Sequence, residues 1–485
     1  MKQLQNLKNK DIYLMSIAVL MFAVWQLQHI DGLRWEYDEG AYLAGAHLLN
    51  QGYSLYDEIF AVQPPLFFYS LLWAFWWPDV AVELGRITII GFAMVGLTFT
   101  GLMGQKFGGR WAGLLTVLVL AWHPRFFLNS KVIIGDVPSM SVAMVALWLG
   151  WQYHDQSSKY RGRVWLFLAG IMMGLAFSLK FLPMFLTPMF VVLIALRQKR
   201  DNGLIDGLID GLIDGLTFLV GLAVVGLAML WHVDFDAFIA TNIEIRRSGL
   251  SAFAALPSWL FVIKDLIDNF GYTSMSLLGL KFLWKNERHG IWLDSWLIIT
   301  LITLVNYKPL WEHLLIVWAF PQAILIAIAI KQITLFIKSQ KPKINFATAT
   351  IATITMWFVL FLPHQFDKNM ESLVAPSHAS DAEIIGYLQD NITDRFIITD
   401  EPLLAVVADK KLIPELADVS NVRLVAGNLD EQKLISLTKE YKPQVIIFGW
   451  DQRFTRNRPE YLAWVKAHYV SVPLKTKGNL LFIEQ

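Results

Sequence analysis

The sequence predicts a polytopic α-helical membrane protein with a small α/β domain at its C-terminal end. Of the 485 residues, 55% are apolar and only 17% are charged, which is too hydrophobic for an ordinary soluble domain. Successive apolar windows of roughly 17 to 22 residues have the length of membrane-spanning helices. After about residue 364 the composition changes abruptly to that of a soluble module. We therefore expect a membrane domain over 1–363 and an α/β domain over 364–485.

The apolar windows predict about eleven membrane spans. The first window follows three lysines, as in a signal peptide, but it lacks a clear small-x-small cleavage site, so we expect a retained helix. The predicted spans are 12–30, 84–104, 111–123, 137–153, 164–180, 182–196, 216–231, 260–280, 290–306, 312–331 and 346–363.

The distribution of lysine and arginine predicts the orientation of these spans. If the N-terminus is cytoplasmic, most basic residues fall in inside segments, which follows the positive-inside rule. The loop 31–80 and the C-terminal domain then lie on the outer face of the plasma (inner) membrane. A net charge of +1 and the lack of a basic stripe argue against nucleic-acid binding, and the absence of cysteine excludes disulfides and thiolate chemistry.

The first outer loop, 31–80, is rich in carboxylates, including Asp38 and Glu39. Ionisable groups near a bilayer must find partners or water, so such a loop is costly to keep unless it is functional. Asp38 is our candidate base, because transfer onto a sugar or alcohol hydroxyl benefits from a carboxylate that accepts the proton. The alternative is a charge that only stabilises a helix N-terminus. The aromatic stretch after Pro64 and Pro65 predicts an interfacial or re-entrant helix.

Two further residues stand out near the outer ends of later spans. Asp136 either caps a helix or shares a divalent cation or an amine-bearing substrate with Asp38. Lys180 interrupts an apolar run, where an ammonium either serves a function, such as phosphate binding, or snorkels to the interface. Weaker phosphate candidates follow in the outer segments, and the histidine among them could instead bind a metal or be structural: Arg86, Arg125, Lys131, Lys308 and His313.

A tandem GLID repeat occupies Gly203–Leu216 and places Asp206, Asp210 and Asp214 along one stripe of a helix. Its glycines make it a weak helix, so we expect a cytoplasmic interfacial helix or a loop insertion rather than a metal site. In the C-terminal domain we expect helices at Asp381–Asn391, capped by Ser380, and at Asp430–Tyr441, with strands at 396–399, 444–450 and 479–484.

The sequence contains no P-loop, no dinucleotide fingerprint and no sizeable cytoplasmic domain to hold a nucleotide sugar. A sugar donor used at the outer face should therefore be linked to a polyprenyl lipid. The order DEGAYLAGAHLLNQGYSLYDEIFAVQPPL, GDVPSM, LAFSLK and YKPLWEH resembles the membrane glycosyltransferases of GT-C architecture. The most similar groups are the protein O-mannosyltransferases and the lipid A aminoarabinose transferases, over roughly the first 330 residues.

This resemblance implies an inverting transferase with a polyprenyl-phosphate sugar donor and a glycan, lipid or protein acceptor. Asp38 takes the base or metal-site role, Glu39 assists, Asp136 is the second-loop acid, and Lys180 lies near the lipid phosphate. A divalent cation at Asp38 and Asp136 is the one cofactor that this implies. The expected substrate loop contains Tyr42, Asp57, Gln63, Pro64 and Pro65, with Gln63 where the aminoarabinose enzymes have lysine.

Two other functions are compatible with outer-face charges. One is a transporter or flippase for a lipid-linked saccharide, which should show inverted repeats or discontinuous helices. The other is a non-catalytic scaffold whose outer domain binds envelope glycans.

Overall fold

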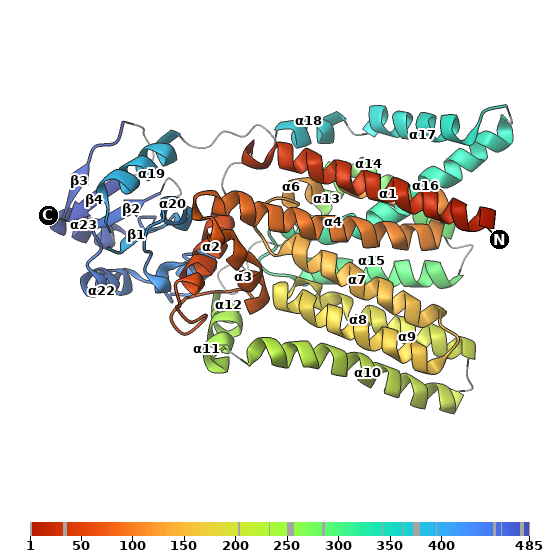
Figure 1. The fold of residues 1–485 in the computed structure, drawn as a ribbon, viewed down its shortest axis with the longest axis horizontal. Helices are drawn as coiled ribbons and strands as arrows, with labels where there is room; N and C mark the ends of the chain where they lie inside the picture. The colour runs from red at the N-terminus through yellow and green to blue at the C-terminus, as the bar shows by residue number, and fades with distance from the viewer. Residues whose placement is uncertain are drawn as a thin grey trace.

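The computed structural model describes residues 2–32, 36–201, 204–231, 233–249, 257–283, 287–341, 343–361, 363–371, 379–393, 395–449, 453–456, 458–475 and 480–484. It consists of a helical bundle with a mixed α/β region at one end (Figure 1). Among the described residues, five helices are long and apolar enough to cross a membrane, and five shorter apolar helices accompany them. The expectation of about eleven spans stays a prediction.

Most of the apolar windows form the bundle helices at the expected positions. The helix that follows residue 312 is the central one, since 94% of its apolar window is buried inside the protein. The bundle helices are α1 (Lys2–Gln28), α4 (Ala81–Gly108), α5 (Arg110–Trp122), α7 (Asp136–Asp155), α8 (Lys159–Leu179), α9 (Pro188–Asp201), α10 (Leu204–Leu230), α15 (Glu287–Asn306), α16 (Ala319–Gln340) and α17 (Phe346–Phe361).

The window 260–280, predicted as one span, forms two helices. α13 (Ser258–Asp268) ends at Asn269, and α14 (Phe270–Leu283) begins immediately after it. The Asn269 Nδ2 donates to the backbone oxygen and to the carboxylate of Asp265, both at 3.0 Å. An asparagine side chain that bonds the neighbouring backbone competes with the helical pattern, which explains the break. Hydropathy could not detect it.

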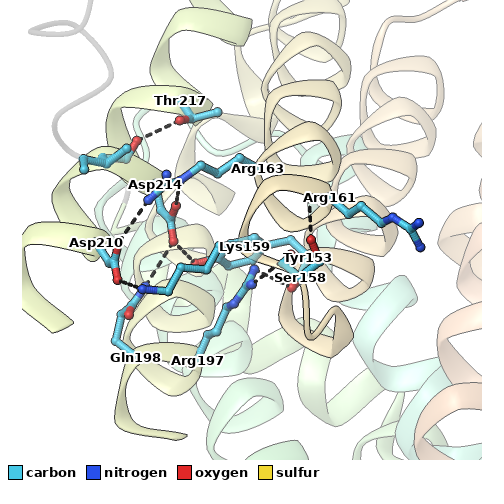
Figure 2. Close-up of polar contacts among 11 residues, drawn as sticks. Tyr153, Ser158, Lys159, Arg161, Arg163, Arg197, Gln198, Asp210, Asp214 and Thr217 are labelled. Atoms are coloured by element: carbon cyan, nitrogen blue, oxygen red, sulfur yellow. Dashed lines mark hydrogen bonds and ion pairs between the residues drawn. The ribbon is translucent and has the colours of Figure 1, made fainter. Parts of the chain in front are cut away.

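Residues 204–216 of the GLID repeat are neither a separate helix nor a loop insertion, because they form the first turns of α10. Asp214 accepts hydrogen bonds from Tyr153 at 2.7 Å, Arg163 at 2.8 Å and Gln198 at 3.0 Å, as Figure 2 shows. Asp210 accepts from Arg163 at 3.0 Å and from Lys159. These bonds from neighbouring helices offset the poor helix propensity of the glycines.

Segment 31–80 lies between the bundle and the α/β region (Figure 1). It folds as η1 (Ile30–Gly32), α2 (Tyr37–Asn50), α3 (Pro65–Leu71), η2 (Leu72–Trp76) and η3 (Pro78–Val80). Short elements join it at the same end of the bundle: α11 (Phe235–Ile239), the π-helical η5 (Ala240–Glu244) and α12 (Ile245–Gly249). The remaining connecting elements are α6 (Pro124–Asn129), η4 (Leu182–Leu186), η7 (Glu312–Trp318) and α18 (Pro363–Glu371).

The C-terminal region has a four-stranded mixed sheet in the order β1-β2-β4-β3. β1 and β2 pair in parallel with Ile397 opposite Val445, and the other pairs are antiparallel. The predicted strands and helices appear here, but Ser380 lies within α19 rather than before it. The elements are α19 (Ala379–Asn391), β1 (Ile397–Thr399), α20 (Pro402–Val407), η8 (Pro414–Leu416), α21 (Asn421–Val425), α22 (Glu431–Tyr441), β2 (Val445–Phe448), α23 (Pro459–His468), β3 (Tyr469–Val472) and β4 (Leu480–Glu484).

Candidate functional site

The first turn of α2 sends its two acidic residues in different directions. Consecutive side chains on a helix point about 100° apart, so Asp38 and Glu39 cannot share one environment. Asp38 is half-buried and lines a cavity, whereas Glu39 is fully buried inside the protein. The Asp38 carboxylate can therefore contact a ligand in the cavity, whereas the Glu39 carboxylate cannot.

Glu39 forms a buried ion pair with Arg86 of α4. The Arg86 guanidinium donates to the two Glu39 oxygens at 3.0 and 2.9 Å, and its Nη1 donates to the Ile30 carbonyl at 2.6 Å. Glu39 also accepts the backbone N–H of Ile133 at 3.1 Å and that of Glu36 at 3.3 Å. This carboxylate thus joins α2, α4 and the segment before α7.

These contacts correct two expectations. Glu39 was expected to assist catalysis and Arg86 to bind the donor phosphate, but neither lines the cavity and each satisfies the other. A carboxylate with four donors and a guanidinium that is 2% exposed have a structural role.

The cavity has a volume of about 490 Å³ and lies where segment 31–80, the bundle and the C-terminal region meet. Four of the predicted site residues with a charge or an imidazole line it: Asp38, Lys180, Lys308 and His313. Tyr42 and Gln63 of the predicted substrate loop line it too. The other lining residues are Glu36, Tyr37, Val62, Ile245, Arg246, Tyr307, Pro309, Trp311, Leu314, Ser420, Asn421, Val422 and Arg453.

Lys180 lines the cavity and forms an ion pair with Asp136, which does not line it. Its Nζ donates to Asp136 Oδ2 at 2.7 Å, and His313 Nε2 lies 4.0 Å from the same oxygen. Lys180 sits directly after α8 and Asp136 begins α7, so the two helix ends bring them together. Asp136 is fully buried, and its Oδ1 has no hydrogen-bond partner among the described residues. It therefore holds Lys180 in place instead of facing a ligand itself.

Asp38 and Asp136 supply few ligands for the divalent cation that they were expected to share. No group of three potential ligands comes together in the described part of the chain, and Asp136 already compensates the Lys180 ammonium. Two carboxylates alone fall short of the six or more oxygens that Ca²⁺ or Mg²⁺ takes, unless water or substrate completes the shell. The cation therefore remains a prediction.

Several predicted residues lie outside the cavity. Arg125 pairs with Asp265 at 2.7 Å and with Glu312 at 2.9 Å, and Lys131 donates to the His29 carbonyl at 2.8 Å. Asp57 is exposed and bonds weakly to Ser54 at 3.4 Å. Pro64 and Pro65 do not line the cavity either; they precede and begin α3.

Gln63 and Tyr42 form a buried polar pair at the cavity wall. Gln63 Nε2 donates to the Tyr42 hydroxyl at 3.0 Å, while Gln63 Oε1 has no partner among the described residues. Burial, followed by the nearby Asp38 charge, raises the pKa of Tyr42 well above its usual value. The tyrosine therefore stays a neutral hydroxyl at the cavity wall.

Sequence reasoning missed the cations and polar groups that other segments bring to the cavity. Arg246 of α12 is half-buried there and donates to the Val62 carbonyl at 3.3 Å. Arg453 and the run Ser420–Val422 arrive from the C-terminal region. The Arg246-Arg247 pair in a predicted outer loop was the one signal available, since nothing local indicated that the α/β region meets α2.

The charges that line the cavity favour an anionic ligand. Its carboxylates are Glu36 and Asp38, and its lysine and arginine side chains are Lys180, Arg246, Lys308 and Arg453. Even with Lys180 balanced by Asp136, the cations exceed the carboxylates. The cavity can thus hold an anion such as a phosphate, and the Asp38 carboxylate lines the same cavity.

Comparisons with known proteins agree with this architecture. Residues 12–243 match the family model described as dolichyl-phosphate-mannose-protein mannosyltransferase. The crystal structure of ArnT from Cupriavidus metallidurans in the apo state aligns with a TM-score of 0.67 and 13% identity, covering 98% of both chains. The crystal structure of ArnT from the same organism bound to undecaprenyl phosphate aligns with a TM-score of 0.61 and 13% identity, covering 97% of each chain. No match to a curated protein was found.

A more distant enzyme shares the fold. The oligosaccharyltransferase AglB from Archaeoglobus fulgidus, in complex with an inhibitory peptide and a dolichol-phosphate, aligns with a TM-score of 0.60 and 11% identity. The alignment covers 99% of this chain and 74% of AglB. The chain is a multi-pass membrane protein with the GT-C fold. Residues 12–243 are similar to the mannosyltransferase family model, and the fold as a whole is similar to those of ArnT and AglB.

Proposed function

We propose that this protein is a glycosyltransferase of the extracytoplasmic face of the plasma membrane. It transfers a sugar from a polyprenyl-phosphate donor to an acceptor hydroxyl, with inversion at the anomeric carbon. The observation that carries the proposal is the presence of Asp38 and Lys180 on the wall of one cavity. The family match and the lipid phosphates named in the ArnT and AglB complexes also support it.

In the proposed reaction the carboxylate and the cations of the cavity have different tasks. The Asp38 carboxylate accepts the proton of the acceptor hydroxyl as its oxygen forms a bond to the anomeric carbon. The bond between that carbon and the phosphate oxygen breaks on the opposite face, and the electron pair leaves with the lipid phosphate. Attack opposite the leaving group inverts the configuration.

The leaving phosphate requires positive charge that is already in position. Lys180 is held by Asp136, and Arg246 and Lys308 line the same cavity. Donors fixed before the reaction stabilise developing charge without reorganising, which is the effective form of electrostatic catalysis. The Gln63–Tyr42 pair then provides uncharged hydrogen-bonding groups for a sugar or acceptor hydroxyl.

The test is transfer by purified protein in lipid nanodiscs and in sealed vesicles. A panel of polyprenyl-phosphate sugars, radiolabelled in the sugar, is supplied with a membrane extract as the source of acceptor. The proposal predicts that label moves to a new product while free polyprenyl phosphate appears in equal amount. Movement of intact donor across the vesicle membrane without cleavage would instead establish a flippase.

A further inference from the structure

We infer that the C-terminal α/β region is a positioning part of the active site, acting on Asp38 through Tyr37. This inference rests on the proposed function for its kinetic consequence, but the structural coupling can be measured without it. Tyr37 is the first residue of α2 and immediately precedes Asp38. Whatever fixes Tyr37 therefore fixes the backbone that carries the proposed base.

The C-terminal region holds Tyr37 from two sides. The Tyr37 hydroxyl donates to Asp418 Oδ1 at 3.4 Å and accepts the backbone N–H of Val419. The guanidinium carbon of Arg453 lies 3.6 Å from the centre of the Tyr37 ring, a cation–π contact. The side chain is thus hydrogen-bonded at its hydroxyl and covered on its ring face by residues about 400 positions away in the sequence.

The segment that holds Tyr37 is itself rigidly built. Arg423 is 1% exposed and donates to the backbone oxygens of Glu415 at 2.5 Å and Asp418 at 2.9 Å. Its guanidinium carbon also lies 3.7 Å from the centre of the Phe60 ring, in segment 31–80. Burial lowers the Arg423 pKa to about 10, which keeps it charged at neutral pH. Arg423 therefore fixes Asp418 and joins both parts of the chain.

A close backbone contact makes the junction stiff. A Cβ added at Gly40 of α2 would lie 2.8 Å from the backbone nitrogen of Leu403 in α20, so only glycine allows this approach. The Phe60 N–H also donates to the Pro414 carbonyl at 3.4 Å. Because Arg453 and Ser420–Val422 line the cavity as well, the same contacts that hold α2 also complete the cavity wall.

The experiment compares Tyr37→Phe with a matched loss of a buried hydroxyl elsewhere in the same region. Tyr461→Phe removes the bond between the Tyr461 and Thr438 hydroxyls, 3.0 Å apart, which lies outside the cavity. For Tyr37→Phe we expect kcat to fall about 10-fold with the donor KM changed less than about 2-fold, as for a misplaced base. Tyr461→Phe should leave both constants unchanged.

Hydrogen exchange provides the readout that needs no substrate. In Tyr37→Phe the amides of residues 38–42 should exchange about 10-fold faster, whereas in Tyr461→Phe they should not. Asp418→Asn, which weakens the same bond, is the second variant and should behave like Tyr37→Phe. Unchanged kcat and protection in both Tyr37→Phe and Asp418→Asn, or an equal kcat loss in Tyr461→Phe, would overturn the inference. If the wild type shows no transfer, only the proposed function fails, and the exchange result still decides the coupling.

Discussion

Replacing Glu39 with glutamine tests whether its role is structural rather than catalytic. The substitution leaves the Arg86 guanidinium, 2% exposed, without its carboxylate partner. Breaking one partner of a buried ion pair typically costs about 3–5 kcal/mol of stability. The amide can keep one accepting oxygen toward the Ile133 N–H, so we expect a loss within this range rather than above it.

The assay is the free energy of unfolding of the purified protein in mixed micelles, followed by tryptophan fluorescence. Glu58→Gln, an exposed carboxylate of the same segment, is the control and should change stability by less than about 1 kcal/mol. The double variant Glu39→Gln/Arg86→Met should recover part of the loss, because it removes the uncompensated charge. Unchanged stability in Glu39→Gln, together with transfer as low as in Asp38→Asn, would refute this reasoning.

Two further predictions concern other buried carboxylates. Asp214→Asn weakens the hydrogen bonds to Tyr153 and Arg163 and should lower the free energy of unfolding by about 1–3 kcal/mol. Asp206→Asn, at an exposed position of the same repeat, should leave it unchanged. Equal effects of the two substitutions would contradict a stabilising role of these bonds. Burial raises the pKa of Asp400 to about 6, so the folded state keeps a proton that the unfolded chain loses near pH 4. This group's contribution, up to about 3 kcal/mol, is complete below pH 4 and is lost as pH rises through 6. Thermal unfolding between pH 4 and 7 should show that loss in the wild type and not in Asp400→Asn, and identical pH profiles would contradict it.

Most bundle helices and the general place of the candidate site could be predicted because they depend on local patterns. Apolar windows gave the bundle helices. The parity of the predicted spans put segment 31–80 and the C-terminal region on the same side, and the structure has both at the same end of the bundle (Figure 1). Asp38, Lys180, Lys308 and His313, chosen as ionisable groups near the ends of apolar windows, line one cavity.

The errors arose where tertiary contacts decide. The choice between Asp38 and Glu39 depends on Arg86, which lies 47 positions away from Glu39. Strand β3 escaped prediction because it is four residues long and mostly solvent-exposed, so its hydrophobic pattern is weak. Arg453 belongs to a distant part of the chain, and only the fold brings it onto Tyr37.

The central claim, that Asp38 is the base, is tested most directly by Asp38→Asn with donor binding and transfer measured on the same preparation. We expect the rate of transfer to fall by about 10²–10⁴-fold. The donor dissociation constant should stay within about 3-fold of wild type, and the free energy of unfolding should stay within about 1 kcal/mol of it. Asp79→Asn, an exposed acid in the same segment, should keep full activity. Near-normal transfer by Asp38→Asn would contradict the account.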